Sequence, residues 1–146
     1  MKLIKFTALA VLFLAVFVAS IGFNVLIHES AHYAVADHYD LNPEMNFATT
    51  SMSTAALYST DSDIAYITYL SSSAEVLVED SVIAVAGPLA NLAIACFALL
   101  LYFNPKRSVT GKMLLMLLMV VSFVSFGVNV LPFPPGDGYY IWYHLI

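Results

Sequence analysis

Three long apolar runs limit what this chain can fold into. They cover residues 3–27, 81–103 and 113–132, and an α-helix needs about 20 residues to cross the hydrocarbon core of a bilayer. The chain is 61% hydrophobic and only 10% charged, whereas about a quarter of the residues in a soluble domain are charged. We therefore expect an all-α membrane protein with a core of three transmembrane helices.

The residues that flank these runs set the expected helix ends. Two acids precede the second run and suit the positive end of a helix dipole, Asn104-Pro105 follows it, and Thr110-Gly111 precedes the third run. The elements expected in this single domain, which spans residues 1–146, are membrane helices at about 3–40, 81–103 and 112–132 and a loop at 41–80.

The loop contains segments with the composition of β-strands. Residues 45–58 are rich in Thr and small side chains, and residues 64–70 (IAYITYL) are β-branched or aromatic at most positions. We expect a small β-like loop or hairpin, whose edge could pair with an extended substrate segment. An ordinary loop packed over the helices is the alternative.

The first run has a second interpretation as a secretory signal peptide. Basic residues at positions 2 and 5 precede it, and a weak cleavage site lies near Ala19-Ser20. However, the run is longer than the apolar part of a typical signal peptide and continues directly into a polar motif at 28–32. We therefore expect a retained membrane helix.

That polar motif, His28-Glu29-Ser30-Ala31-His32, matches the HExxH pattern of zinc proteases. Because each residue of an α-helix advances by about 100°, His28 and His32 point nearly the same way and can bind one ion. Glu29 stands beside them, within reach of a zinc-bound water. An ionisable side chain in a membrane helix costs at least a few kcal/mol, so Glu29 is expected to face the bundle interior or water.

The directions of the three helices predict a third ligand. The first and third helices start on the same side of the membrane, so their far ends can meet. The far end of the third is NVLPFPPGDG at 129–138, a proline-rich segment that breaks the helix. Its Asp137 can complete a His-His-carboxylate site for one zinc ion. The segment AGPLAN at 86–91, near the start of the second helix, is expected at the same level.

Charged residues indicate the side on which this site lies. All five basic residues are near the N-terminus or between the second and third runs, and every acid except Glu29 and Asp137 lies between Asp37 and Asp80. By the positive-inside rule, the basic side is cytoplasmic and the acidic loop, with the site, is outside.

Three motifs together resemble the site-two proteases, a family of zinc metalloproteases that cut within membranes. They are HESAH at 28–32, AGPLANL at 86–92 and NVLPFPPGDG at 129–138, in that order on successive predicted helices. The resemblance implies zinc binding by His28, His32 and Asp137, acid/base catalysis by Glu29, and a substrate-holding role for Asn91 and Asn129.

The chain departs from the family pattern at two positions beside the aspartate. Family members commonly have a bulky aliphatic residue where Gly136 stands and a second glycine where Tyr139 stands. The resemblance also implies a cytoplasmic catalytic face, which is the opposite of the orientation that the charges favour.

We expect an intramembrane zinc metalloprotease in which Glu29 activates the zinc-bound water, and which hydrolyses a peptide bond within or near a transmembrane segment of a membrane-anchored protein. We expect this protein in the lipid bilayer of a prokaryotic cell membrane, which the chain crosses several times. No basic patch predicts nucleic-acid binding, and association into a homo-oligomer stays open. The alternatives are a non-catalytic metal-binding protein or scaffold for partner helices, and a membrane-tethered protease for soluble peptides.

Other polar residues have simpler interpretations. His38 and His144 are expected to be surface or interfacial residues, with His144 a substitute ligand at most. Asn91 could bond a neighbouring helix instead of a substrate, and Gly87 could permit close helix approach. The lone Cys96 has no metal-ligand spacing.

Overall fold

The structure, a computed structural model, describes residues 2–47, 65–68, 78–133 and 136–143. Three long helices dominate it and are long and apolar enough to cross a membrane: α1 (Lys2–His38), α2 (Val78–Tyr102) and α3 (Val109–Val130). The other described elements are strands β1 (Glu44–Phe47) and β2 (Ala65–Thr68) and the short helix α4 (Asp137–Tyr143). The expected fold class, three membrane helices with a small hairpin, is confirmed.

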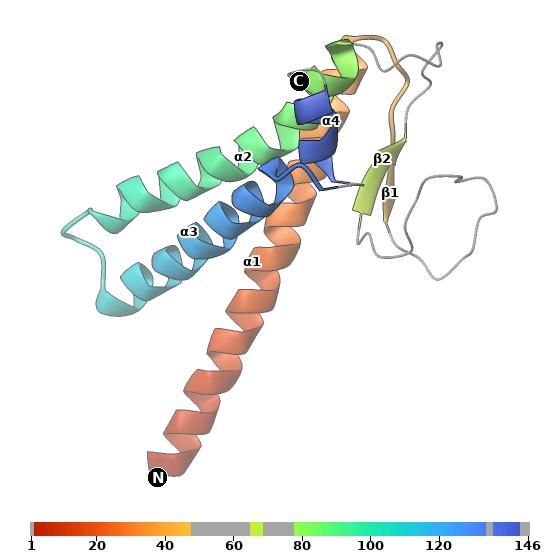
Figure 1. Ribbon diagram of the computed structural model, residues 1–146. Helices are drawn as coiled ribbons and strands as arrows, with labels where there is room; N and C mark the ends of the chain where they lie inside the picture. The colour runs from red at the N-terminus through yellow and green to blue at the C-terminus, as the bar shows by residue number, and fades with distance from the viewer. Residues whose placement is uncertain (1, 48–64, 69–77, 134–135, 144–146) are drawn as a thin grey trace.

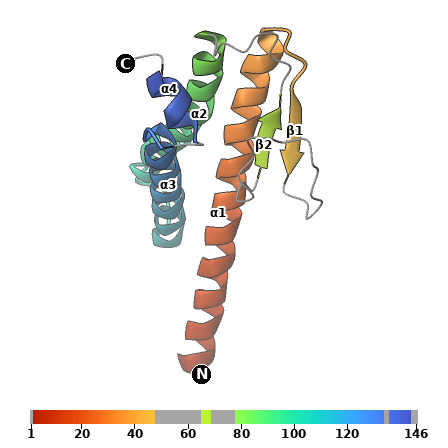
Figure 2. The same ribbon diagram turned by 45° about the vertical axis from the view of Figure 1, so that its right-hand side comes forward.

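The helices meet at one end of the molecule. α2 and α3 run antiparallel and side by side, and the C-terminal half of α1 packs against both, while its N-terminal half extends beyond them (Figures 1 and 2). α4 packs on α2 and α3 where α2 begins and α3 ends. The meeting of the far ends of the first and third helices with the start of the second is thus confirmed.

Apart from Glu29, the buried side chains described in α1 recur every four residues, which places them on one helix face. The side chains of Ser20 and Asn24 form hydrogen bonds with backbone carbonyl groups of α1. Ser20 Oγ donates to Val16 O at 2.8 Å, and Asn24 Nδ2 donates to Ser20 O at 2.8 Å. The face turned into the protein is therefore polar, as is usual where membrane helices pack. Its members are Ser20, Asn24, His28, His32 and Ala36.

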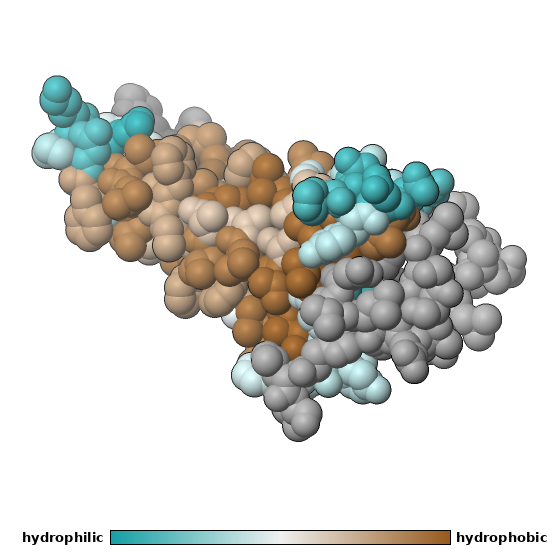
Figure 3. All heavy atoms as spheres, turned by 90° about the horizontal axis from the view of Figure 1, so that it is seen from above, coloured by the Kyte–Doolittle hydropathy of each residue, from teal (hydrophilic) through white to brown (hydrophobic). Residues whose placement is uncertain are grey.

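The outer surface of the helices is apolar over most of its length. Figure 3 shows a hydrophobic band along the helices with hydrophilic residues at each end. Large side chains in it are more than half exposed, including Phe97 and Leu100 on α2 and Phe123 on α3. Water would penalise such a surface, whereas lipid tails solvate it.

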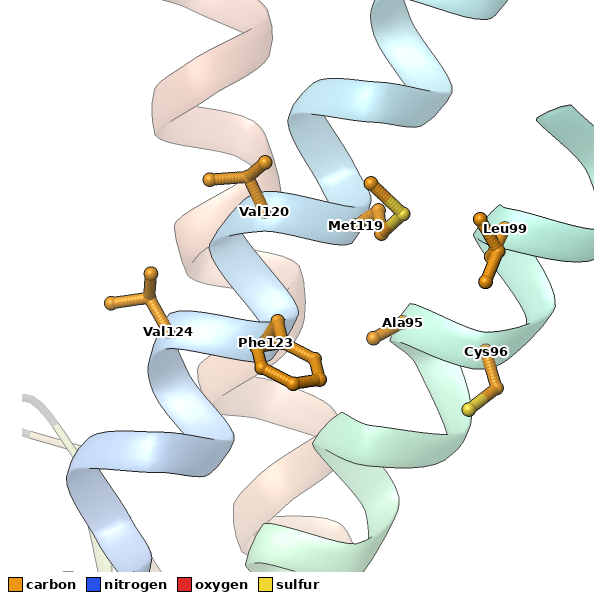
Figure 4. A pocket seen from close by; sticks show the side chains of 7 residues that line it. All are labelled: Ala95, Cys96, Leu99, Met119, Val120, Phe123 and Val124. Atoms are coloured by element: carbon orange, nitrogen blue, oxygen red, sulfur yellow. The ribbon is translucent and has the colours of Figure 1, made fainter.

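A groove of about 360 Å³ lies in this band between α2 and α3 (Figure 4). Its walls are apolar and include the Cys96 thiol. The lining residues are Ala95, Cys96, Leu99, Met119, Val120, Phe123 and Val124.

The strands form an antiparallel pair that packs beside α1. Glu44 pairs with Thr68 and Phe47 with Ala65. Each segment predicted to be strand-like therefore overlaps a strand, and residues 48–64 lie outside the described part. α1 ends in a turn in which Leu41 N–H donates to Ala36 O at 3.1 Å and Asp40 has a φ of 57°. Asp tolerates this left-handed conformation better than most residues.

The observed helix ends differ from the predicted ones by one to three residues. α1 ends at His38 rather than 40, α2 begins at Val78 rather than 81, and α3 begins at Val109 because Ser108 caps it by accepting from Gly111 N–H at 3.1 Å. The prediction followed the apolar runs, whereas polar residues stand in the first turn of α2 and at the N-cap of α3, where they favour helix N-termini.

Candidate metal centre

His28 and His32 are adjacent on the buried face of α1, one helical turn apart. Their Nε2 atoms are 3.1 Å from each other, and both side chains are less than a tenth exposed. The HExxH spacing therefore directs two imidazole nitrogens to one point, as predicted.

A backbone carbonyl of α2 fixes the orientation of His32. Its Nδ1 lies 2.6 Å from Ile83 O, and because a carbonyl oxygen only accepts hydrogen bonds, Nδ1 must carry the proton. The lone pair of the neutral ring is then on Nε2, which faces the centre of the site. Metal-binding histidines in proteins are held in this way.

Asp137 is the first residue of α4, and several contacts hold this helix in place. Trp142 Nε1 donates to Val130 O at 2.8 Å, and Ser81 Oγ donates to Tyr140 O at 3.2 Å. Gly138 is buried against the backbone of residues 130–131 so closely that a Cβ would collide with it. α4 is thereby fixed to both α2 and α3, and its first side chain points at the two histidines.

The three predicted ligands come together. Asp137 Oδ2 lies 2.9 Å from His28 Nε2, and Oδ1 lies 3.4 Å from His32 Nε2. Two ligand atoms of a tetrahedral zinc ion, each about 2.0–2.1 Å from the metal, are roughly 3.3 Å apart. His28, His32 and Asp137 are therefore close enough to bind one metal ion.

Two further observations fit an ion at this point. Asp137 Oδ2 is buried without a hydrogen-bond partner among the described residues, although it lies 2.9 Å from an imidazole nitrogen. A cation bound by both atoms would satisfy that oxygen. In addition, Gly87 of α2 faces the two rings, and a Cβ there would lie within 2.7 Å of His28 Nε2 and closer still to His32 Nε2. Only glycine leaves this space open.

The histidines also determine the charge of Asp137. Burial raises the pKa of Asp137, but the contacts with His28 and His32 outweigh burial and lower the pKa from its usual 3.8 to about 2. Asp137 is therefore a carboxylate, the form that binds a metal, throughout the neutral and mildly acidic range.

Glu29 lies beside the ligands and faces the protein, as predicted from the cost of exposing it to lipid. It is 9% exposed and close enough to His32 for a coulombic interaction. The side chain of Asp137 is 22% exposed, so the site is not fully enclosed. The arrangement can bind a cation and supply a carboxylate next to it.

The two asparagines have different surroundings. Asn91 is fully buried, with Nδ2 3.0 Å from His28 Nδ1 and 2.8 Å from Ser125 Oγ. Asn91 thus bonds both neighbouring helices, which is the contact that the alternative interpretation of this residue expected. Asn129 donates to Ser125 O of its own helix at 3.0 Å. A role of either residue in holding substrate stays a prediction.

Sequence reasoning missed the backbone carbonyl of Ile83 and the hydroxyl of Ser125. The first has no signal in the sequence, because the N–H that Pro88 lacks would pair with Ala84 O and not with Ile83 O. A signal for the second is the spacing of Ser122, Ser125 and Asn129, three polar residues on adjoining positions of one face of α3. His144 lies outside the described residues.

This candidate site is identified from the sequence and the structure of this chain. Comparisons of the chain with protein-family models, with curated proteins and with solved structures found no match.

Proposed function

We propose that this chain is an intramembrane zinc metalloprotease of the site-two protease type. The observation that carries the proposal is the convergence of His28, His32 and Asp137 beside the carboxylate of Glu29, at one end of three helices that can cross a membrane. Two histidines and a carboxylate leave a fourth position of a tetrahedral zinc ion open for water or substrate.

The residues of the site suit peptide hydrolysis. A zinc ion bound there would acidify a water molecule and polarise a carbonyl group. Glu29 takes the proton from the attacking water and passes it to the departing amine. Asp137 and His32, each fixed by contacts outside the site, keep the ligand atoms in place.

The proposed substrate is a membrane-anchored protein that is cut within or near its transmembrane segment. The site lies at the end of apolar helices, so a helix in the bilayer can approach it laterally. In a helix the carbonyl groups are hydrogen-bonded and surrounded by side chains, so the segment to be cut must unwind. The hairpin β1–β2 packs beside α1, and an extended segment could pair with its edge.

The test is cleavage of a membrane-spanning substrate by the purified protein in lipid vesicles, with Glu29→Gln as the critical variant. We expect Glu29→Gln to keep its zinc but to cut at least about 100-fold more slowly, since general acid/base catalysis contributes about 10²–10⁴-fold. Asp37→Asn is the matched control, because Asp37 is exposed near the end of α1.

Three outcomes distinguish the candidate functions. Equal cutting by Glu29→Gln and wild type would refute the hydrolytic mechanism. Zinc binding without cleavage by either protein would favour a metal-binding or scaffold role. Faster cutting of water-soluble peptides than of membrane substrates would favour a tethered protease for soluble peptides.

A further inference from the structure

Asn91 contacts the candidate ligand His28 at Nδ1, the ring nitrogen that does not face Asp137. It is fully buried on α2, and its Nδ2 lies 3.0 Å from Nδ1 of His28 and 2.8 Å from the hydroxyl of Ser125. The amide oxygen is buried without a hydrogen-bond partner among the described residues. Asn91 therefore connects all three membrane helices at the nitrogen of His28 that does not face Asp137.

The group that stands against Nδ1 decides what the other nitrogen of His28 can do. A neutral imidazole carries one proton, on either Nδ1 or Nε2. With the amide nitrogen of Asn91 donating, Nδ1 holds the lone pair, and the proton sits on Nε2, which faces Asp137. A ring in that form cannot bind a metal through Nε2.

Rotation of the Asn91 side-chain amide by half a turn would move the proton of His28 from Nε2 to Nδ1. The oxygen of Asn91 would then accept the proton of Nδ1, and the lone pair of Nε2 would face the centre of the site. The two arms of an amide have nearly the same shape, so no helix has to move. The Ser125 hydroxyl can either accept or donate, and it can therefore bond either arm.

We propose that Asn91 is a positioning residue that sets which nitrogen of His28 carries the proton, and so whether His28 can bind the metal. His32 differs, because the Ile83 carbonyl, 2.6 Å from Nδ1, already holds the proton of His32 on Nδ1. Metal binding thus turns the amide of Asn91 and changes the tautomer of His28 alone. This inference rests on the proposed zinc site but not on the identity of the substrate.

The first test uses nitrogen NMR of ¹⁵N-histidine-labelled protein that keeps Asn91 and carries His38→Gln and His144→Gln, so that only His28 and His32 give signals. Without metal, we expect one histidine protonated on Nε2 and one on Nδ1. After addition of zinc, both should carry the proton on Nδ1. Finding both rings protonated on Nδ1 before zinc is added would overturn the proposal.

The second test measures zinc affinity by competition with a chelator. Asn91→Leu removes the acceptor and should weaken zinc binding by about 10- to 100-fold, which is typical for lost partners of metal ligands. Asn91→Asp retains an oxygen toward Nδ1 and should restore affinity to within about threefold of wild type. Asn129→Leu is the control, because the bond of Asn129 stays within α3.

The outcomes separate this inference from the proposed function. Wild-type affinity in Asn91→Leu, with zinc-dependent cleavage intact, would overturn the role of Asn91 alone. Failure of wild-type protein to bind zinc would overturn the role of Asn91 together with the zinc site. Weak binding by both Asn91→Leu and Asn91→Asp would show a purely structural role, and the NMR spectrum of the protein that keeps Asn91 gives its answer even if an Asn91 variant fails to fold.

Discussion

At the scale of single residues, the site contains two kinds of ligand that respond differently to acid. The pKa of Asp137 is lowered to about 2 by its contacts with the histidines, so Asp137 keeps its charge well below neutral pH. Its favourable contacts are therefore complete above pH 4 and are lost as the pH falls toward 2. An imidazole, by contrast, binds a metal only in its neutral form, through a ring nitrogen that carries no proton.

The charge of Asp137 predicts the effect of Asp137→Asn. This substitution keeps the shape of the side chain but removes its negative charge, so zinc binding at neutral pH should weaken. The measurement is chelator competition in Glu29→Gln protein, so that Glu29 takes no part. Unchanged zinc affinity in Asp137→Asn would remove Asp137 from the ligand set.

At the scale of elements, the site depends on close contacts that only glycine permits. Gly87 brings α2 against the two histidine rings, and a methyl group there would occupy the space beside both Nε2 atoms. We predict that Gly87→Ala weakens zinc binding by at least about 100-fold, because the rings must turn away from Asp137.

The matched control for Gly87→Ala is Gly127→Ala in α3. A Cβ at position 127 has nothing within 4 Å, so zinc affinity should be unchanged, and the free energy of unfolding should rise slightly because alanine favours helices. Chelator competition and thermal unfolding in detergent measure the two effects. Unchanged zinc affinity in Gly87→Ala would mean that the rings do not occupy this position.

A second pair of glycines tests how α4 presents its aspartate. A Cβ at Gly138 would collide with the backbone of residues 130–131, whereas a Cβ at Gly136 would meet only Phe133 O at 3.4 Å, an ordinary contact. Gly138→Ala should therefore displace α4 and Asp137 and reduce zinc binding, while Gly136→Ala should bind zinc like wild type. Loss of binding in Gly136→Ala alone would contradict this account.

How far the sequence predicts each element depends on the range of the forces that form it. Membrane helices follow from local composition, and the HExxH spacing follows from helix periodicity, so α1 and its two histidines could be predicted. The docking of α4 depends on the bond between Trp142 and Val130 and on the fit of Gly138. The contact of Asn91 with His28 depends on how α1 and α2 pack. Such tertiary contacts leave no periodic pattern in the chain.

At the scale of the whole molecule, the site lies at the end opposite the basic residues. Lys106 and Arg107 are exposed in the turn between α2 and α3, which lies far from α4 (Figure 1). The apolar stretch of α1 has 32 residues, or about 48 Å at 1.5 Å per residue. This exceeds the roughly 30 Å hydrocarbon core, so α1 must tilt or extend beyond it. The length of α1 therefore does not determine on which side of the membrane the site lies. The distribution of basic residues is the main physical determinant of that side.

The positive-inside rule predicts a cytoplasmic turn between α2 and α3 and an external site. The chain has one cysteine, so Cys96→Ala provides a background for single cysteines at Asn104, in the turn, and at His38, the last residue of α1. In intact cells, a maleimide that does not cross membranes should label His38→Cys and not Asn104→Cys. After permeabilisation both should react.

Reversing the charge of the turn supplies an independent check on the cause of this orientation. Lys106→Glu combined with Arg107→Glu removes two of the five basic residues, and labelling of Asn104→Cys in intact cells should then increase, because the bias that retains the turn in the cytoplasm is weakened. Labelling of Asn104→Cys but not His38→Cys with the native charges would place the site on the cytoplasmic side, where the resemblance to site-two proteases puts it. In that case packing or the insertion pathway, rather than charge, would determine how the chain crosses the membrane.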